Sequence, residues 1–377
     1  MTSNTKNRMP LVDAMKGIAC VLIVSHHLAF YGPMSDVAQP LAPTLISWLY
    51  DYGRIAVQVF LVMAGFLTAG HLSQFGRSGQ PVPVLSLVWQ RYLRLAVPYV
   101  LALAVAMLVS ALVRPWLHHD SVPTAPDLWR VLAHVLMLHG WFGQESLSAG
   151  VWYVAIDLQL YALAVMVYWL GQKLTGQTGP TDPAARLRLT AWVVSLTCSL
   201  MLASLLFFNR NAVFDNTGFY FFGSYALGMM TRWASGRRQP WLWLSCLAVL
   251  GLVALLVEFR LRIAVALITA MLLGMVMLRG AWHWVGHAWL GWLGRISYSV
   301  FLIHFPICLI YNTLWSRWFP TSPWMNVLGM VLAVLTSIAC GHLFWATAER
   351  RGSALVLGWL ARRQDGGVRS SSAGSAG

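Results

Sequence analysis

The chain has 377 residues, of which 58% are hydrophobic and 10% are charged, and its formal net charge is +14. Soluble domains carry roughly a quarter of charged residues, so this composition excludes a water-soluble fold of this size. The basic residues lie mostly in short loops between apolar runs, which is typical of cytoplasmic loops that face anionic lipid. We therefore expect an integral membrane protein in contact with lipid, without a nucleic-acid partner.

Ten apolar runs approach the length that a helix needs to cross ~30 Å of hydrocarbon. They predict an all-α fold, a polytopic transmembrane helix bundle of about ten spans. We expect one transmembrane domain over 1–350, followed by a basic and flexible cytoplasmic tail over 351–377. The runs lie near 11–31, 53–72, 95–113, 151–171, 189–208, 217–232, 240–257, 261–279, 295–315 and 325–347.

A weaker run at 128–142 bears on the orientation of the chain. If this run does not cross the membrane, ten spans place both termini and most of the 26 Lys and Arg residues in the cytoplasm. If it crosses, the loop that carries Lys173, Arg186 and Arg188 turns outward, against the positive-inside rule. The charge pattern therefore favours ten spans, with 114–150 outside.

The first predicted helix carries ionisable side chains, which are costly in a membrane and therefore functional candidates. Lys16 and His27 are separated by three helical turns plus about 20°, so they share one face, ~16 Å apart along the axis. His26 points about 80° away. A histidine in a membrane often only bonds a neighbouring helix, but the lysine on the same face favours a functional reading of His27.

Two arginines stand at the cytoplasmic start of the third span. Arg91 and Arg94 have i, i+3 spacing and so face the same way. They could be ordinary positive-inside flanking residues. Two guanidinium groups at a membrane mouth also suit a polyphosphate, which they can bind with paired hydrogen bonds.

Two further polar groups fall inside later spans. By helical rise, Asp157 lies ~10 Å below the outer face and His304 ~16 Å above the inner edge, so both could share a level with His27. A carboxylate and two imidazoles at one depth could handle protons. They could equally be a buried polar network without chemistry.

A metal site is not expected. His283 and His287 have the i, i+4 spacing of two metal ligands, but no carboxylate lies nearby to complete the set.

Five motifs in chain order resemble the membrane-bound acyltransferase-3 family of bacterial O-acyltransferases, over most of residues 10–350. The pattern D-x-x-K-G-I-A before His27 resembles the first-helix motif of that family, with Lys16 where arginine is more usual. Ala64 replaces the usual serine, and Asp157 stands near the position of the usual acid. The other matching segments are VQVFLVMAGFL at 57–67, QRYLR, WYVAIDLQLY and LGRISYSVFLIHFPI.

The resemblance implies that acetyl-CoA or another acyl-CoA binds from the cytoplasm, with its phosphates held by Lys16, Arg91 and Arg94. Its acyl group would pass to a hydroxyl of a surface polysaccharide or a lipid-linked saccharide precursor, outside a bacterial inner membrane. We expect no fused C-terminal hydrolase-like domain, because about 30 residues follow the last predicted span.

The resemblance also implies the catalytic roles. We expect His27 to act as the general base or as a transient acyl acceptor, and Asp157 and His304 to orient it or to transfer protons. Two alternatives stay open: an acyltransferase for a small hydroxylated molecule such as a macrolide, and a proton-coupled transporter that uses the same side chains as its relay. Transporters commonly have duplicated halves, and no internal repeat is evident in this sequence.

Overall fold

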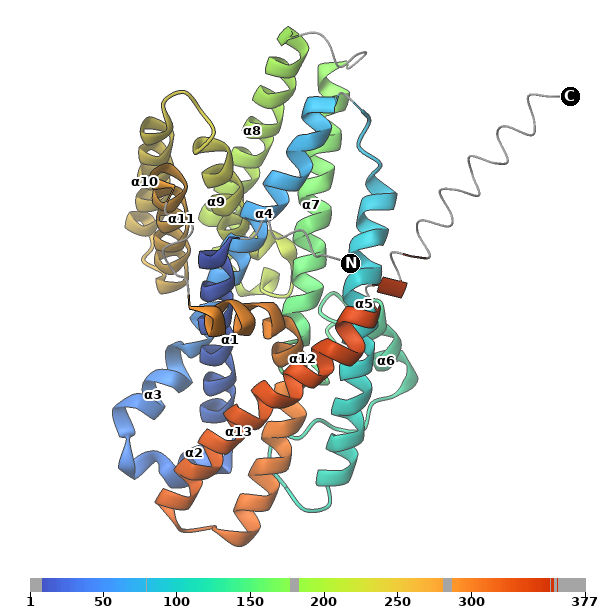
Figure 1. The fold of residues 1–377 in the computed structure, drawn as a ribbon, viewed down its shortest axis with the longest axis vertical. Coiled ribbons are helices and arrows are strands. Elements are labelled where there is room, and N and C mark those ends of the chain that lie inside the picture. The colour runs from blue at the N-terminus through green and yellow to red at the C-terminus, as the bar shows by residue number, and fades with distance from the viewer. Residues whose placement is uncertain are drawn as a thin grey trace, which may run out of the picture.

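The computed structural model describes residues 9–78, 80–176, 183–280 and 287–352, together with 354–355 and 358. Within these ranges every regular element is a helix, as predicted (Figure 1). The long helices are α1 (Pro10–Phe30), α4 (Ala56–Ser78), α5 (Val84–Val113), α7 (Val151–Thr175), α8 (Pro183–Leu206), α9 (Gly218–Ala234), α10 (Pro240–Val257), α11 (Leu261–Arg279), α12 (Ala288–Trp318) and α13 (Pro323–Phe344).

Short helices join several of the long ones. Two of them, α2 and α3, fill the connection after α1, and a π-helix continues α13. The short elements are α2 (Pro33–Ala38), η2 (Gln39–Leu41), α3 (Pro43–Tyr52), η3 (Gly53–Ile55), α6 (Leu128–Val135), η4 (Phe208–Arg210), η5 (Ala212–Phe214) and η7 (Trp345–Glu349).

In the described part of the chain, nine helical stretches are long and apolar enough to cross a membrane. They confirm the predicted polytopic bundle. The remaining predicted span forms α9, which has 17 residues, most of them buried. The weak run at 128–142 forms only the eight-residue α6, about 12 Å long, which is too short to cross ~30 Å of hydrocarbon.

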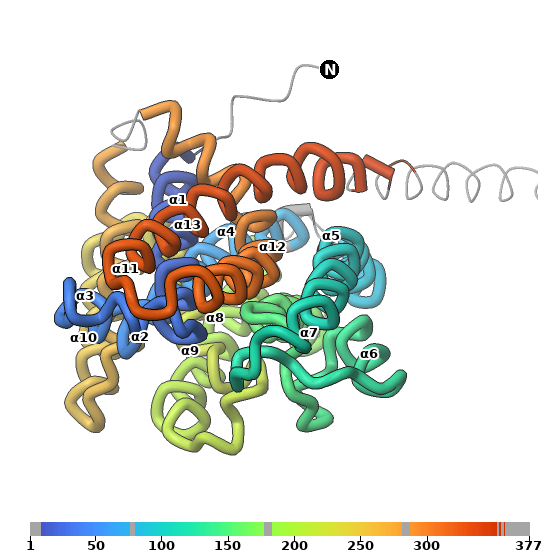
Figure 2. Tube along the Cα trace, turned by 90° about the horizontal axis from the view of Figure 1, so that it is seen from below, coloured from blue at the N-terminus to red at the C-terminus, as the bar shows by residue number. Residues whose placement is uncertain are grey.

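Helix α12 packs against both α1 and α5. Figures 1 and 2 both place it between α1 and α5. Two glycines let α1 and α12 touch. A Cβ atom on Gly294 would collide with the carbonyl group of Asp13, and one on Gly17 would lie 3.0 Å from the side chain of Leu293. Small residues allow such close helix packing in membranes, and this contact fixes α1 against α12.

Helices α4 and α9 cross in the same way. A Cβ atom on Gly65 of α4 would collide with the carbonyl oxygen of Tyr225, and one on Gly228 of α9 would collide with that of Val62. The Tyr225 hydroxyl also donates a hydrogen bond to Thr68 Oγ1 at 2.8 Å. The crossing therefore holds the middle of α4 in place, and this part of α4 faces the cavity described below.

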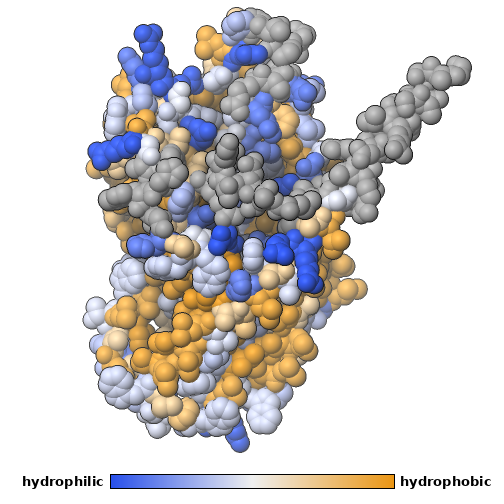
Figure 3. All heavy atoms as spheres, viewed as in Figure 1, coloured by the Kyte–Doolittle hydropathy of each residue, from blue (hydrophilic) through white to orange (hydrophobic). Residues whose placement is uncertain are grey.

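Apolar side chains cover the outside of the bundle, as lipid contact requires. The lower part of the face in Figure 3 is mostly apolar, where Figure 1 places α13 and the C-terminal half of α5. On α5 these side chains include Leu101, Leu108 and Leu112, and on α13 they include Leu328 and Leu335, all exposed in the isolated chain. Polar groups inside such a bundle must find partners within the protein.

Candidate functional site

A cavity of about 520 Å³ opens among helices α1, α4, α5, α7, α12 and η7. Its lining is unusual for a membrane bundle because it holds several charged side chains. The charged or titratable lining residues are Lys16, His71, Arg91, Arg94, Asp157, Arg295 and Glu349, and the aromatic ones are Phe60, Tyr153, Tyr161, Tyr298 and Phe301.

An ion pair lies at the wall between α5 and α7. Arg91 Nη2 lies 2.6 Å from Asp157 Oδ2, and the Asp157 side chain is only 8% exposed. The Arg91 guanidinium also stacks over the Tyr161 ring, at 5.4 Å from its centroid. Its Nε is buried and has no hydrogen-bond partner among the described residues. Arg91 thus neutralises the buried carboxylate of Asp157 and keeps one donor to offer to a ligand.

The remaining charges of the cavity are mostly positive. Arg94 and Arg295 are exposed, whereas Lys16 and Glu349 are half-buried. The Glu349 carboxylate accepts a hydrogen bond from Ser299 Oγ at 2.6 Å. With Asp157 paired to Arg91, three cations face one remaining carboxylate, so the cavity favours an anionic ligand.

Two histidines from distant parts of the chain form a buried pair outside this cavity. His27 Nδ1 lies 2.7 Å from His304 Nε2, and His304 Nδ1 lies 2.7 Å from the carbonyl oxygen of Phe301. A carbonyl oxygen can only accept, so His304 Nδ1 carries a proton and donates it. In the neutral pair His304 Nε2 is then the acceptor and His27 Nδ1 the donor. His27 Nε2 is left with a free lone pair, and no described residue donates to it.

The neighbouring histidine of α1 faces elsewhere. His26 Nδ1 lies 2.8 Å from the carbonyl oxygen of Leu49 in α3, whereas His27 meets α12. The predicted difference in direction between His26 and His27 is confirmed.

The structure brings together only part of the predicted proton-handling cluster. His27 and His304 meet, but Asp157 pairs with Arg91 and lines the cavity with Lys16. The prediction that Asp157 joins the two histidines is wrong. It assumed that each helix starts at its apolar run, but α5 begins at Val84 rather than at residue 95, so Arg91 lies about two turns inside it and reaches Asp157.

The two arginines of α5 face the same way, as predicted, but have different surroundings. Arg91 and Arg94 line the same cavity, as their i, i+3 spacing predicted. They differ in setting, because Arg91 is engaged by Asp157 while Arg94 is exposed.

Several cavity residues were not singled out from the sequence. Arg295 received no role of its own, although it lies within the quoted segment LGRISYSVFLIHFPI. Glu349 carries a signal that could have been used, since it is an acid next to two arginines at the end of the last span. Tyr153 and Phe301 lie within the quoted motifs, but aromatic residues are common in apolar runs, so the sequence did not indicate that they line a cavity.

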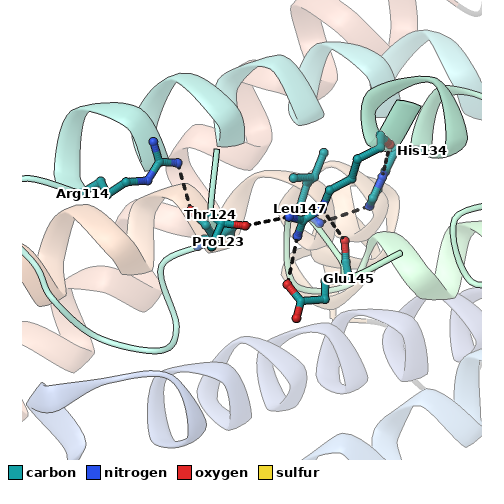
Figure 4. A network of polar contacts seen from close by, with 7 residues as sticks. Arg114, Pro123, Thr124, His134, Glu145 and Leu147 are labelled. Atoms are coloured by element: carbon teal, nitrogen blue, oxygen red, sulfur yellow. Dashed lines mark hydrogen bonds and ion pairs between the residues drawn. The ribbon is translucent and has the colours of Figure 1, made fainter. Parts of the chain in front are cut away.

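The segment between α5 and α7 carries its own polar network (Figure 4). The buried Arg130 side chain donates to the Glu145 carbonyl oxygen at 3.0 Å and to Thr124 Oγ1 at 2.9 Å. His134 accepts from the Leu147 backbone N–H at 3.2 Å, as Figure 4 shows. The ring of His139 stacks on that of His134 with centroids 4.1 Å apart. These contacts join distant parts of the segment to one another and so order a chain of mostly irregular backbone.

No group of three metal-ligating side chains occurs among the residues that the structure describes. His283, the first residue of the predicted His283/His287 pair, lies outside the described residues.

Comparison with known proteins supplies the remaining finding. The chain matches the acyltransferase domain that defines the acyltransferase 3 family over residues 10–345. It is also 22% identical over 178 residues to the Caenorhabditis elegans protein named regulator of hypoxia-inducible factor 1. That match covers 44% of this chain and 35% of the nematode protein, so the chain spans about a third of its relative. No solved structure matches the chain significantly.

Proposed function

The chain belongs to the acyltransferase 3 family, and from that premise we propose that this multi-pass membrane protein transfers a short acyl group from acyl-CoA to a hydroxyl of an extracytoplasmic saccharide. The observation that carries the proposal is the directed hydrogen-bond chain from Phe301 through His304 to His27, which leaves His27 Nε2 free to accept a proton. The cationic cavity on the other side of Phe301 supplies the donor site.

The donor is the polyanionic substrate. Arg94, Arg295 and Lys16 would hold its phosphates, and the buried and unpartnered Nε of Arg91 offers one more donor. Guanidinium groups bind phosphate oxygens through paired, charge-assisted hydrogen bonds. A cavity of about 520 Å³ suits part of such a molecule, so we expect the nucleotide to remain at the exposed rim near Arg94 and Arg295.

The free lone pair on His27 Nε2 allows His27 to act as the general base of acyl transfer. His27 Nε2 takes the proton of the acceptor hydroxyl, whose oxygen attacks the thioester carbonyl carbon. The carbon–sulfur bond breaks, the ester forms, and the leaving thiolate takes the proton from His27, which returns to its neutral state. While His27 is protonated, its Nδ1–H still donates to His304 Nε2, and the Phe301 carbonyl oxygen still holds His304. His304 therefore orients His27 and stabilises its charged form.

Asp157 takes a different role from the one expected of it. Its carboxylate fixes the Arg91 guanidinium at 2.6 Å and so shapes the donor cavity. We assign it to the positioning of Arg91.

The acceptor side rests on the predicted topology. With the N-terminus inside, His27 near the end of α1 lies toward the outer face, whereas Lys16 near its start lies toward the cytoplasm. A saccharide hydroxyl outside a bacterial inner membrane, on a surface polysaccharide or its lipid-linked precursor, would then reach His27 from the side opposite to the donor.

The test is direct. The purified protein in lipid nanodiscs is incubated with acetyl-CoA and lipid-linked saccharide extract from its own host, and free CoA thiol is followed together with acetyl ester formed on the saccharide. We expect both products in equal amount, and neither with His27→Ala. Binding of acetyl-CoA without any thiol release under these conditions would contradict transfer.

A further inference from the structure

One aromatic side chain separates the charged cavity from the histidine pair. Phe301 lies one turn before His304 on α12 and lines the cavity, while neither His27 nor His304 is among its described lining residues. The Phe301 ring is 5% exposed, and its centroid lies 6.0 Å from that of the His304 ring. A group that enters from the cavity therefore meets Phe301 before it meets the histidines.

The ring is held on its other sides by two aromatic residues of the cavity. Its centroid lies 5.5 Å from that of Tyr153 and 6.4 Å from that of Phe60. Such edge-to-face and tilted contacts are favourable aromatic geometries. The three rings give this part of the cavity lining an apolar surface, which suits a hydrocarbon chain and not a phosphate.

The backbone at the start of α7 is shaped around the same ring. Gly150 has φ +89°, and a Cβ atom there would lie only 2.8 Å from Phe301 Cζ. Glycine is thus required at this position both by the backbone conformation and by the tip of the Phe301 ring. Because the ring is packed tightly against backbone, it has little room to yield to a longer ligand.

We propose that Phe301 determines acyl-chain specificity: its ring is the floor of the acyl site and limits the donor to short acyl chains. This inference rests on the proposed function. An acetyl or propionyl group fits in front of the ring, whereas each further methylene of a longer chain meets the ring. Removal of the Phe301 ring would open space for longer chains. The substitution keeps the backbone carbonyl group of residue 301, which accepts the hydrogen bond from His304.

The experiment measures the dissociation constants of acetyl-, butyryl-, hexanoyl- and octanoyl-CoA by calorimetry in nanodiscs for the wild type, Phe301→Ala and Phe301→Leu. We expect the wild type to prefer acetyl-CoA over hexanoyl-CoA by about tenfold or more, and Phe301→Ala to remove or reverse that preference, since buried methylenes then contribute to affinity. Phe301→Leu, which keeps most of the packing, should shift the preference by a smaller factor in the same direction.

The matched control is Phe305→Ala, one turn further along α12. Phe305 is also buried, at 2% exposure, but it packs against Tyr31 and does not line the cavity in the described structure. This variant should keep the wild-type order of chain lengths. If Phe301→Ala does not yield a folded protein, Phe301→Leu decides.

The outcomes separate this inference from the proposed function. A wild type that binds no CoA thioester contradicts the proposed donor. A wild type that binds acetyl-CoA but shows no chain-length preference, or Phe301 variants with an unchanged preference, would overturn the role of Phe301 and leave the proposed donor standing.

Discussion

His27 and His304 are 277 positions apart in the chain, yet His27 Nδ1 lies 2.7 Å from His304 Nε2. Further along the same two helices, Gly294 packs against the backbone carbonyl group of Asp13 and Gly17 packs against the Leu293 side chain. These contacts hold together α1 and α12, the two helices that carry the imidazoles.

We predict that His27→Ala lowers the rate of acyl transfer by about 10²–10⁴-fold, which is the usual contribution of a general base. His26→Ala is the matched control, because His26 bonds the Leu49 carbonyl oxygen of α3 and not α12. Thiol release from acetyl-CoA measures both, with size-exclusion profiles to confirm folding. Equal losses in the two variants would remove His27 from the catalytic role.

Arg94→Ala and Arg295→Ala should each weaken acyl-CoA binding by roughly tenfold to a hundredfold, because a charge-assisted hydrogen bond contributes ~1.5–3 kcal/mol. Both residues are exposed at the cavity, so stability should change little. Binding should also weaken with added salt. Arg238→Ala, an exposed arginine outside the cavity lining, is the control. Unchanged affinity in the Arg94/Arg295 double variant would show that neither residue binds the donor and that both serve only as positive-inside flanking residues.

Asp157→Ala should destabilise the protein by about 3 kcal/mol, toward the lower end of what a broken buried pair costs, because the Arg91 side chain is partly exposed. The exposed fractions are 36% for Arg91 and 8% for Asp157. The double variant Arg91→Met/Asp157→Leu should recover part of that loss. Thermal unfolding in detergent of the single variants Arg91→Met and Asp157→Leu and of the double variant gives the coupling. Strict additivity would show that the pair contributes nothing to stability.

The segment between α5 and α7 should loosen in acid. Burial, and then the nearby His134, lowers the pKa of His139 from 6.5 to about 3, and burial also lowers the pKa of His134. The unfolded segment therefore binds more protons than the folded one between these pKa values. The stabilisation is complete above pH 6.5 and is lost progressively as the pH falls toward 3.

Limited proteolysis of this segment at pH 7.5 and pH 5 measures the effect. Cleavage should accelerate at pH 5 in the wild type and less in His139→Phe, which keeps a buried ring without a titratable nitrogen. Equal acid sensitivity of the two proteins would assign the effect to other groups.

The predicted topology can be checked with single cysteines at Ala125, Lys173 and Gly236, all exposed positions, in a background without the five native cysteines. An impermeant maleimide should label only Ala125→Cys in cells whose outer barrier is permeabilised, because α6 is too short to cross the membrane. Labelling at Lys173→Cys would reverse the orientation of α7 and remove His27 from the outer half.

The sequence by itself determined the class of fold. Runs of about 20 apolar residues leave a helix as the only way to satisfy backbone groups in lipid, so the helices could be predicted without knowledge of their neighbours. Periodicity within one helix was equally reliable: the different directions of His26 and His27, and the shared cavity of Arg91 and Arg94, follow from 100° per residue.

Only the tertiary structure decided which polar residues meet. Depth along an apolar run did not predict the partner of Asp157, because the true start of α5 lies at Val84, within polar sequence, and brings Arg91 to the level of Asp157. The separation of the cavity from the histidine pair by Phe301 also depends on the crossing of α1, α7 and α12. Hydropathy measures how readily a residue passes from water into lipid. Contacts between helices depend instead on the shapes of the side chains at the crossing points, and these shapes cannot be predicted from hydropathy or helical periodicity.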